Sequence, residues 1–260
     1  MRHNVPYTLL FSAALCVVCA IMVSASAVSL KDLQEANKAL DRKINVLEAA
    51  GLIEADAKVS AAEVEGLFGT FEAVFVDLAT GKELEGGDTE TYDQQRAKKN
   101  PATSSEVPTN LSRVSRIPNK AVVYKVLDDA GVVKTLILPI EGYGLWGTLY
   151  GFLALEADTS TVVGLTYYEH KETPGLGGEI ENPRWKRLWP GRKVYDEDWQ
   201  TALEVIKGNA GPATADPYRV DGLSGATITS RGVTNMIDFW MGDRAFGPYL
   251  ESLRRERSAA

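Results

Sequence analysis

The chain has very little cysteine or histidine. Its two cysteines, Cys16 and Cys19, both lie in an apolar N-terminal segment. Their position excludes a disulfide framework, and also a thiolate cluster for iron–sulfur or zinc, in the rest of the chain. The two histidines are His3 and His170, and no Ser-His-Asp arrangement for nucleophilic catalysis is apparent around them.

Positive charge is also scarce. The sequence has 28 Lys and Arg residues against 35 Asp and Glu residues, which gives a net charge of −7. It contains no basic stripe and no motif that stacks bases. These features argue against nucleic acid as a partner.

A long apolar run without charged residues is present near the N-terminus, from Thr8 to Val28. As a helix it would extend roughly 31 Å, which is enough for the hydrocarbon core of a bilayer. Ala25-Ser26-Ala27 could instead be the cleavage site of a signal peptide. Because the run is longer than the apolar part of most signal peptides, we expect residues 1–28 to remain as a membrane anchor.

Helix and strand signals organise the rest of the chain. Ser29 is expected to cap a helix that Gly51 ends, and Ser60 opens a capping-box pattern, so 29–70 is predicted to be a helical stalk region. Apolar runs joined by turn residues predict strands at 71–78, 121–127, 132–140, 150–155, 161–168 and 202–206. The predicted fold is α+β: a single N-terminal transmembrane helix, then a soluble domain with mainly antiparallel sheet and flanking helices.

Within the predicted domain 71–260, the polar stretch 81–118 is predicted to be a long surface loop. Further helices are expected at 185–189 and at 243–257. Another is indicated between Val233 and Met241, where Val233, Met236, Ile237 and Trp240 share one helical face.

A run of hydroxyl and small residues, Asp221-Gly222-Leu223-Ser224-Gly225-Ala226-Thr227-Ile228-Thr229-Ser230, precedes that helix. Free N–H groups and the helix dipole make the start of a helix favourable for an anion. The two glycines let the backbone bend and approach a ligand closely. On residue types alone, a capped helix after a glycine turn is the alternative.

The longer string resembles the flavinylation motif of the periplasmic FMN-binding domain family, Asp-Gly-x-Ser-Gly-Ala-Thr. In that family the last threonine is esterified to the phosphate of FMN, which corresponds to Thr227 here. The resemblance implies covalent FMN on Thr227. It also implies a separate flavin transferase, with FAD as donor, that attaches it. The recognition sequence and phosphate bed would then be Ser224, Gly225, Ala226 and Thr229.

The resemblance covers nearly the whole chain. Ser29-Leu30-Lys31-Asp32-Leu33-Gln34, the segment from His170 to Gly177 and the overall length are similar to the C subunits of sodium-translocating NADH:quinone oxidoreductases. This implies an electron-transfer subunit of a sodium-pumping respiratory complex, with other membrane subunits as partners and NADH oxidised elsewhere. The alternatives are the G subunit of the related ferredoxin-linked ion-pumping complex, a stand-alone periplasmic flavoprotein and a non-redox adaptor with an unmodified motif.

The resemblance also implies a bacterial inner-membrane protein that crosses once and holds its large domain in the periplasm. The charges around the apolar run argue the other way, because Arg2 precedes it and Lys31, Lys38, Arg42 and Lys43 follow it. Long domains are translocated largely regardless of such charges. We therefore expect the periplasmic orientation.

Two further glycine-rich segments are candidates for the flavin ring. Glu172, Thr173, Gly175, Leu176 and Gly177 belong to a turn whose N–H groups could bond flavin carbonyls and whose leucine could cover a ring face. A surface turn set by Pro174 is the alternative.

The third segment comprises Gly144, Leu145 and Trp146 within Gly142–Gly147. A strand rather than a helix follows it, so it fails the test for a dinucleotide-binding loop. It is either a glycine-rich loop beside the flavin or an ordinary inter-strand loop. His170 with Glu169 and Glu172 lacks convincing ligand geometry, so no metal is expected.

Overall fold

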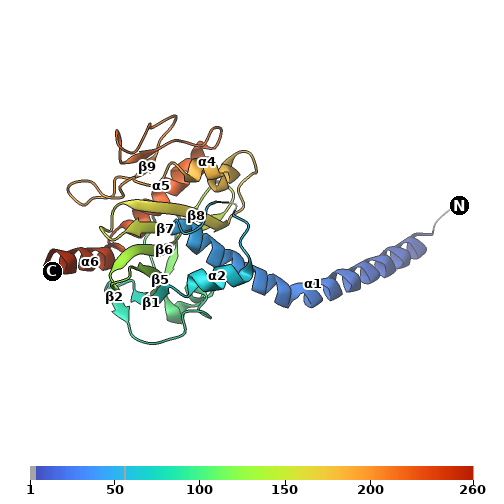
Figure 1. The fold of residues 1–260 in the computed structure, drawn as a ribbon. Helices are drawn as coiled ribbons and strands as arrows, with labels where there is room; N and C mark the ends of the chain where they lie inside the picture. Colours follow the sequence, from blue (N-terminus) through green and yellow to red (C-terminus); the bar gives the residue numbers. More distant parts are fainter. Residues whose placement is uncertain (1–3, 56, 260) are drawn as a thin grey trace. The chain divides into compact units, whose positions relative to one another are not determined.

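The computed structural model describes residues 4–55 and 57–259 (Figure 1). Arg2 and His3 lie outside these ranges. The chain divides into two units, residues 1–42 and 43–260, which are described separately below.

The N-terminal helix α1 is continuous from Val5 to Ala49. Ser29, which the sequence predicts as a helix cap, lies inside α1, and its hydroxyl donates to Ser26 O at 3.0 Å. The cap prediction is wrong because neither glycine nor proline interrupts the sequence between Tyr7 and Ala50. The predicted end is confirmed: Gly51 has φ +70°, and its N–H donates to Glu48 O.

In the first unit, α1 contains an 18-residue window with a mean hydropathy of 2.4, none of it buried within the protein. By length and composition this part of α1 can cross a membrane. The second unit begins at Lys43, inside the predicted stalk. Val46, Leu47 and Ala49 are fully buried there, so the boundary predicted at 70/71 falls within a folded unit.

The second unit is built on a six-stranded sheet in which every pair is antiparallel. The predicted α+β class is thereby confirmed. Figure 1 shows the strands rising from the bottom of the view in the order β2 (Lys82–Leu84), β1 (Phe71–Asp77), β5 (Lys120–Leu127), β6 (Val133–Tyr143), β7 (Thr148–Glu156), β8 (Val162–Glu169).

Both faces of the sheet are covered, since successive strand residues point to opposite sides. Val122 belongs to one apolar cluster, with Val46 and Ala49 from the end of α1. Val123 belongs to the other, with side chains of α5 (Thr227–Met241) and α6 (Gly247–Ala259). The predicted helical face is confirmed, because Val233, Met236, Ile237 and Trp240 of α5 are all buried in this second cluster.

The segment 81–118 is predicted from the sequence to be one long loop, and this prediction is wrong. Besides β2 it contains α3 (Gln94–Lys99), the 3-10 helix η1 (Pro101–Thr103), β3 (Ser104–Glu106) and β4 (Arg116–Pro118). Polar side chains stabilise the starts of the two short helices, because Asp93 caps α3 and Asn100 caps η1. An ion pair from Lys98 to the buried Glu141 holds α3 on the sheet.

Most of the remaining elements are short. Ser60 forms the predicted capping box at the start of α2 (Ala61–Phe68). The segment after β8 contains η2 (Gly177–Glu181) and α4 (Pro183–Lys186), and the predicted strand 202–206 shrinks to β9 (Glu204–Val205), paired in parallel with β10 (Arg219–Val220). The predicted helix at 243–257 is α6, which begins at Gly247.

Candidate functional site

The three segments singled out in the sequence meet at one edge of the sheet. β6 and β8 are both antiparallel to β7, so they run in the same direction and their C-terminal ends share an edge. The segment Gly144–Gly147 follows β6, and the segment His170–Leu176 follows β8. The start of α5 lies over the end of β6, because an added Cβ at Gly232 would be 2.5 Å from Tyr143 O.

The carboxylate of Glu172 joins these three segments. Its Oε1 accepts hydrogen bonds from the N–H groups of Leu145 at 3.0 Å and Trp146 at 2.9 Å. Its Oε2 accepts from Thr229 Oγ1 at 2.6 Å. Glu172 is only 5% exposed, so its carboxylate is directed into the protein rather than toward a ligand. We therefore replace the flavin contact predicted for Glu172 by a positioning role.

Two of the predicted glycines make room for this carboxylate. An added Cβ would lie 2.6 Å from Glu172 Oε1 at Gly144, and 2.5 Å from Oε2 at Gly177. Gly175 differs from them, because its surroundings are open but its φ of +74° is one that side chains disfavour. Gly144 and Gly177 thus serve packing, and Gly175 serves backbone conformation.

α5 begins directly at the flavinylation motif. Thr227 is its first residue and is exposed, as are Ser224 and Gly225. The capping residue Ala226 offers no side chain to the first-turn N–H groups, so the helix is not closed by a Ser or Thr cap. The start of α5 is therefore open to an anion.

Thr229 is completely buried and its hydroxyl is engaged by Glu172. Burial makes it a support for the helix start rather than a phosphate contact.

The first half of the motif is fixed against the segment 206–210. Asp221 Oδ1 accepts from Ala210 N–H at 2.8 Å, and Gly222 N–H donates to Gly208 O at 3.0 Å. An added Cβ at Gly222 would lie 2.1 Å from Ile206 O, so only glycine fits there. The aspartate and first glycine of the motif therefore hold the backbone in place.

A pocket of about 560 Å³ lies beside Thr227. The motif lines one side, from Asp221 to Gly225 together with Thr227 and Ser230. The lining also includes Lys207, Asn209 and Arg231, which were not predicted from the sequence. Arg231 could have been found, because it follows Thr227 by four residues and shares its helix face. Nothing in the sequence brings residues 205–209 to this place.

Large apolar side chains are exposed on the three joined segments. Leu145, Trp146, Leu176 and Ile228 are between 41% and 63% exposed. Leu176 reaches the motif, because its Cδ2 lies 3.1 Å from the position of an added Cβ at Gly225. Exposed apolar groups beside an anion-binding helix start suit a ligand with a flat apolar ring and a phosphate.

His170 stabilises the turn that carries Glu172. Its Nδ1 accepts from the N–H of Glu172 at 3.0 Å, so the hydrogen is on Nε2, which contacts Glu181 Oε1 at 3.1 Å. This hydrogen bond is the main cause that lowers the pKa of Glu181 below its usual value. Both ring nitrogens of His170 are thus used to hold the turn.

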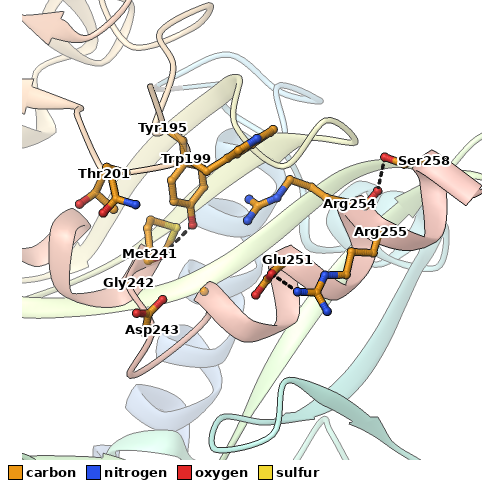
Figure 2. A pocket seen from close by; sticks show the side chains of 12 residues that line it. Tyr195, Trp199, Thr201, Met241, Gly242, Asp243, Glu251, Arg254, Arg255 and Ser258 are labelled. Carbon is orange, nitrogen blue, oxygen red and sulfur yellow. Dashed lines mark hydrogen bonds and ion pairs between the residues drawn. The ribbon is translucent and has the colours of Figure 1, made fainter. Parts of the chain in front are cut away.

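A larger pocket, of about 690 Å³, lies at the other end of α5 (Figure 2). Figure 2 shows Arg254 beside Trp199, with its guanidinium 4.0 Å from the ring centre, and Arg255 paired with Glu251. None of the residues that line this larger pocket belongs to the three segments. The smaller pocket beside Thr227 is therefore the candidate site.

Comparison with known proteins identifies a cofactor-binding family model and named relatives of this chain. A family model described as the FMN-binding domain matches residues 144–242, a range that includes all three segments. The Na(+)-translocating NADH-quinone reductase C subunit from Pseudomonas aeruginosa is 44% identical over 258 residues, covering 98% of each chain. The protein of the same name from Vibrio alginolyticus is 45% identical over 256 residues, covering 97% of this chain and 96% of the relative.

Two crystal structures share the fold. NqrC from Shewanella oneidensis matches with a TM-score of 0.77 and 33% identity, over 85% of this chain and 99% of the other. The Na(+)-translocating NADH-quinone reductase C subunit from Parabacteroides distasonis matches with a TM-score of 0.63 and 27% identity, over 85% and 96%.

Proposed function

The chain belongs to the family of C subunits of the Na(+)-translocating NADH-quinone reductase, and on that premise we propose that it holds FMN covalently on Thr227. It is an FMN-carrying electron-transfer subunit of this oxidoreductase complex. The names of the relatives favour this function over the G subunit of the ferredoxin-linked complex. We propose in addition that the FMN is linked covalently, that Thr227 is the linked residue, and that the domain lies in the periplasm.

The observation that carries the proposal is the exposure of Thr227 at the open start of α5. A threonine hydroxyl that is to form a phosphoester must be reachable by the flavin donor, and Thr227 lines the pocket while Thr229 does not. The attached phosphate keeps a negative charge. The first-turn N–H groups and the cations of Lys207 and Arg231 lining the pocket favour that charge.

The ring would be held by the apolar side chains of Leu145, Trp146 and Leu176, with Thr173 and Gly175 on the same turn as Leu176. FMN, when bound, supplies the electron-transfer chemistry. The chain itself supplies position, an apolar surface that excludes water from the ring, and N–H groups near it. Attachment would also retain the cofactor on a domain in the periplasm, a compartment that has no supply of FMN.

Attachment requires a second protein. A threonine hydroxyl is a weak nucleophile at neutral pH unless a base activates it, and the two nitrogens of His170 are occupied by the turn. We propose that a flavin transferase uses FAD as donor. Thr227 Oγ1 then forms a bond to the FMN phosphorus, the bond to the AMP phosphate breaks, and AMP and the hydroxyl proton leave.

The location follows from α1 and from the family. One apolar helix in the described residues and the membership in this complex are consistent with a single-pass protein of the bacterial inner membrane. We propose that the domain lies in the periplasm and contacts other membrane subunits there. NADH would be oxidised on another subunit, since no nicotinamide motif is present in the sequence.

The intact mass of the full chain tests the proposal. Chain extracted from membranes of cells that contain the transferase should weigh one FMN residue more than Thr227→Ala chain, and the adduct should map to Thr227. Flavin fluorescence in a denaturing gel gives an independent reading. An adduct that persists in Thr227→Ala would refute the assignment, and wild-type chain without any adduct would favour an adaptor with an unmodified motif.

A further inference from the structure

Glu172 belongs to one of the three site segments, and its carboxylate accepts hydrogen bonds from the other two. The Glu172 clamp consists of four groups: the Glu172 carboxylate, the N–H groups of Leu145 and Trp146, and the hydroxyl of Thr229. We propose that Glu172 is a positioning residue. The clamp fixes the distance between the apolar side chains of Leu145, Trp146 and Leu176 and the attachment residue Thr227. This inference rests on the proposed function, because it concerns the same flavin site.

The clamp joins parts of the chain that are far apart in sequence. Glu172 follows Trp146 by 26 residues and precedes Thr229 by 57. Without such a contact, the loops would sample more arrangements relative to one another, since each free residue has appreciable conformational entropy. Both carboxylate oxygens accept hydrogen bonds from these distant parts, so this side chain can hold the loops together.

Each arm of the clamp positions a group that the site uses. Trp146 is 63% exposed and its backbone N–H is bonded to Glu172, so the bond fixes the backbone that carries the ring. Thr229 lies in the first turn of α5, two residues after Thr227, so its hydroxyl fixes the direction of the attachment residue. Leu176 follows Glu172 in the same turn. One carboxylate thus positions both the apolar side chains that are proposed to hold the flavin ring and Thr227, which is proposed to hold the phosphate.

The packing around the carboxylate is specific to this arrangement. Glu172 meets Gly144 on one side and Gly177 on the other, and neither position has space for a Cβ. The Cβ position at Gly177 is also only 2.6 Å from Thr229 Oγ1.

The full chain, made with and without the transferase, tests the clamp. In Glu172→Ala without flavin, the amide hydrogens of Leu145 and Trp146 should exchange about tenfold faster or more, because their acceptor is gone. With flavin attached, the midpoint potential and the visible absorption band should shift while the mass still shows one FMN on Thr227. Glu172→Gln retains an oxygen acceptor for the loop and should restore slow exchange.

Glu169→Gln is the matched control. It makes the same change of charge three residues earlier, at the exposed last residue of β8 outside the clamp, and it should leave exchange and potential unchanged. If Glu172→Ala does not fold, Thr229→Val decides the question: it removes one arm only, and an unchanged potential in that variant overturns the proposal.

Wild-type exchange and potential in a folded Glu172→Ala chain also overturn the proposal. So does a Glu172→Gln chain that is as altered as Glu172→Ala, because the charge rather than the position would then matter. These failures differ from a failure of the proposed function, in which the wild-type chain itself carries no FMN.

Discussion

Thr227 and Thr229 lie two residues apart in α5 and face opposite environments. Thr227 is exposed beside the pocket, whereas Thr229 is fully buried and donates to Glu172. Two residues correspond to about 200° around a helix, so one side chain faces solvent when the other faces the core. The sequence alone offers two threonines for attachment, and their exposure separates them.

The first prediction concerns this pair. Thr229→Val should retain one FMN on Thr227, because the removed hydroxyl is a support, and Thr227→Ser should retain the adduct through its own hydroxyl. Thr229→Val should also lower the free energy of unfolding by about 1–3 kcal/mol, since a buried carboxylate oxygen loses its donor. Intact mass and urea denaturation measure the two effects. An adduct found on Thr229 in the wild-type chain would contradict the assignment.

Leu176→Asp should alter the bound flavin without preventing its attachment. The added charge stands beside the motif and opposes the charge gained on reduction. The free energy of reduction should therefore become less favourable by an amount on the order of 1.4 kcal/mol, and the midpoint potential should fall. Redox titration and the absorption spectrum measure it. Leu84→Asp on β2 is the control, because Leu84 is exposed to a similar degree, 41% against 45%, and lies outside the site. Equal potentials in both folded variants would remove the Glu172–Gly178 turn from the flavin site.

Gly177→Ala should destabilise the domain by about 1–3 kcal/mol and accelerate exchange at the amide of Trp146. Its added methyl group overlaps Glu172 Oε2 and Thr229 Oγ1, so the clamp must open or the backbone must shift. Gly66→Ala in α2 is the control, since an added Cβ meets nothing within 4 Å there, and alanine should stabilise the helix slightly. A Gly177→Ala chain as stable as the wild type would show that the clamp tolerates the methyl group.

The N-terminal segment should remain on the mature chain. N-terminal sequencing of membrane-purified protein should find the original terminus, and a chain that begins near Val28 would identify a signal peptide instead. Protease added to intact spheroplasts should digest the domain. Digestion only after permeabilisation would place the domain in the cytoplasm, as the positive charges after the apolar run would predict.

Acid should weaken the turn that His170 holds. Because the pKa of Glu181 is lower in the folded chain, the unfolded chain binds the proton first as the pH falls. The stabilisation is present above the usual carboxyl pKa of about 4.3 and is lost as the pH falls through the lower folded value. Glu181→Gln should therefore lower Tm slightly near neutral pH and hardly at all at acid pH. A difference in Tm that grew on acidification would reverse the assignment; the exposed Glu85→Gln serves as control.

Local patterns in the sequence determined much of the fold. The five principal strands and the buried face of α5 follow from periodic apolar residues, and the capping box of Ser60 follows from local hydrogen bonding. The motif at Asp221–Ser230 marked the start of α5 because glycine and hydroxyl residues shape a helix terminus locally. These features depend on neighbours in sequence, so they can be read without the fold.

Only the tertiary structure decided how the site is assembled. Ser29 has the chemistry of a cap but lies in a continuous helix, because an uninterrupted run of helix formers outweighs one capping hydroxyl. Glu172 was predicted as a flavin contact but is buried between Leu145 and Thr229, and Lys207 reaches the pocket from a segment without a sequence signal. Burial and hydrogen bonding between distant segments depend on how the strands and α5 pack, and no local pattern contains that information.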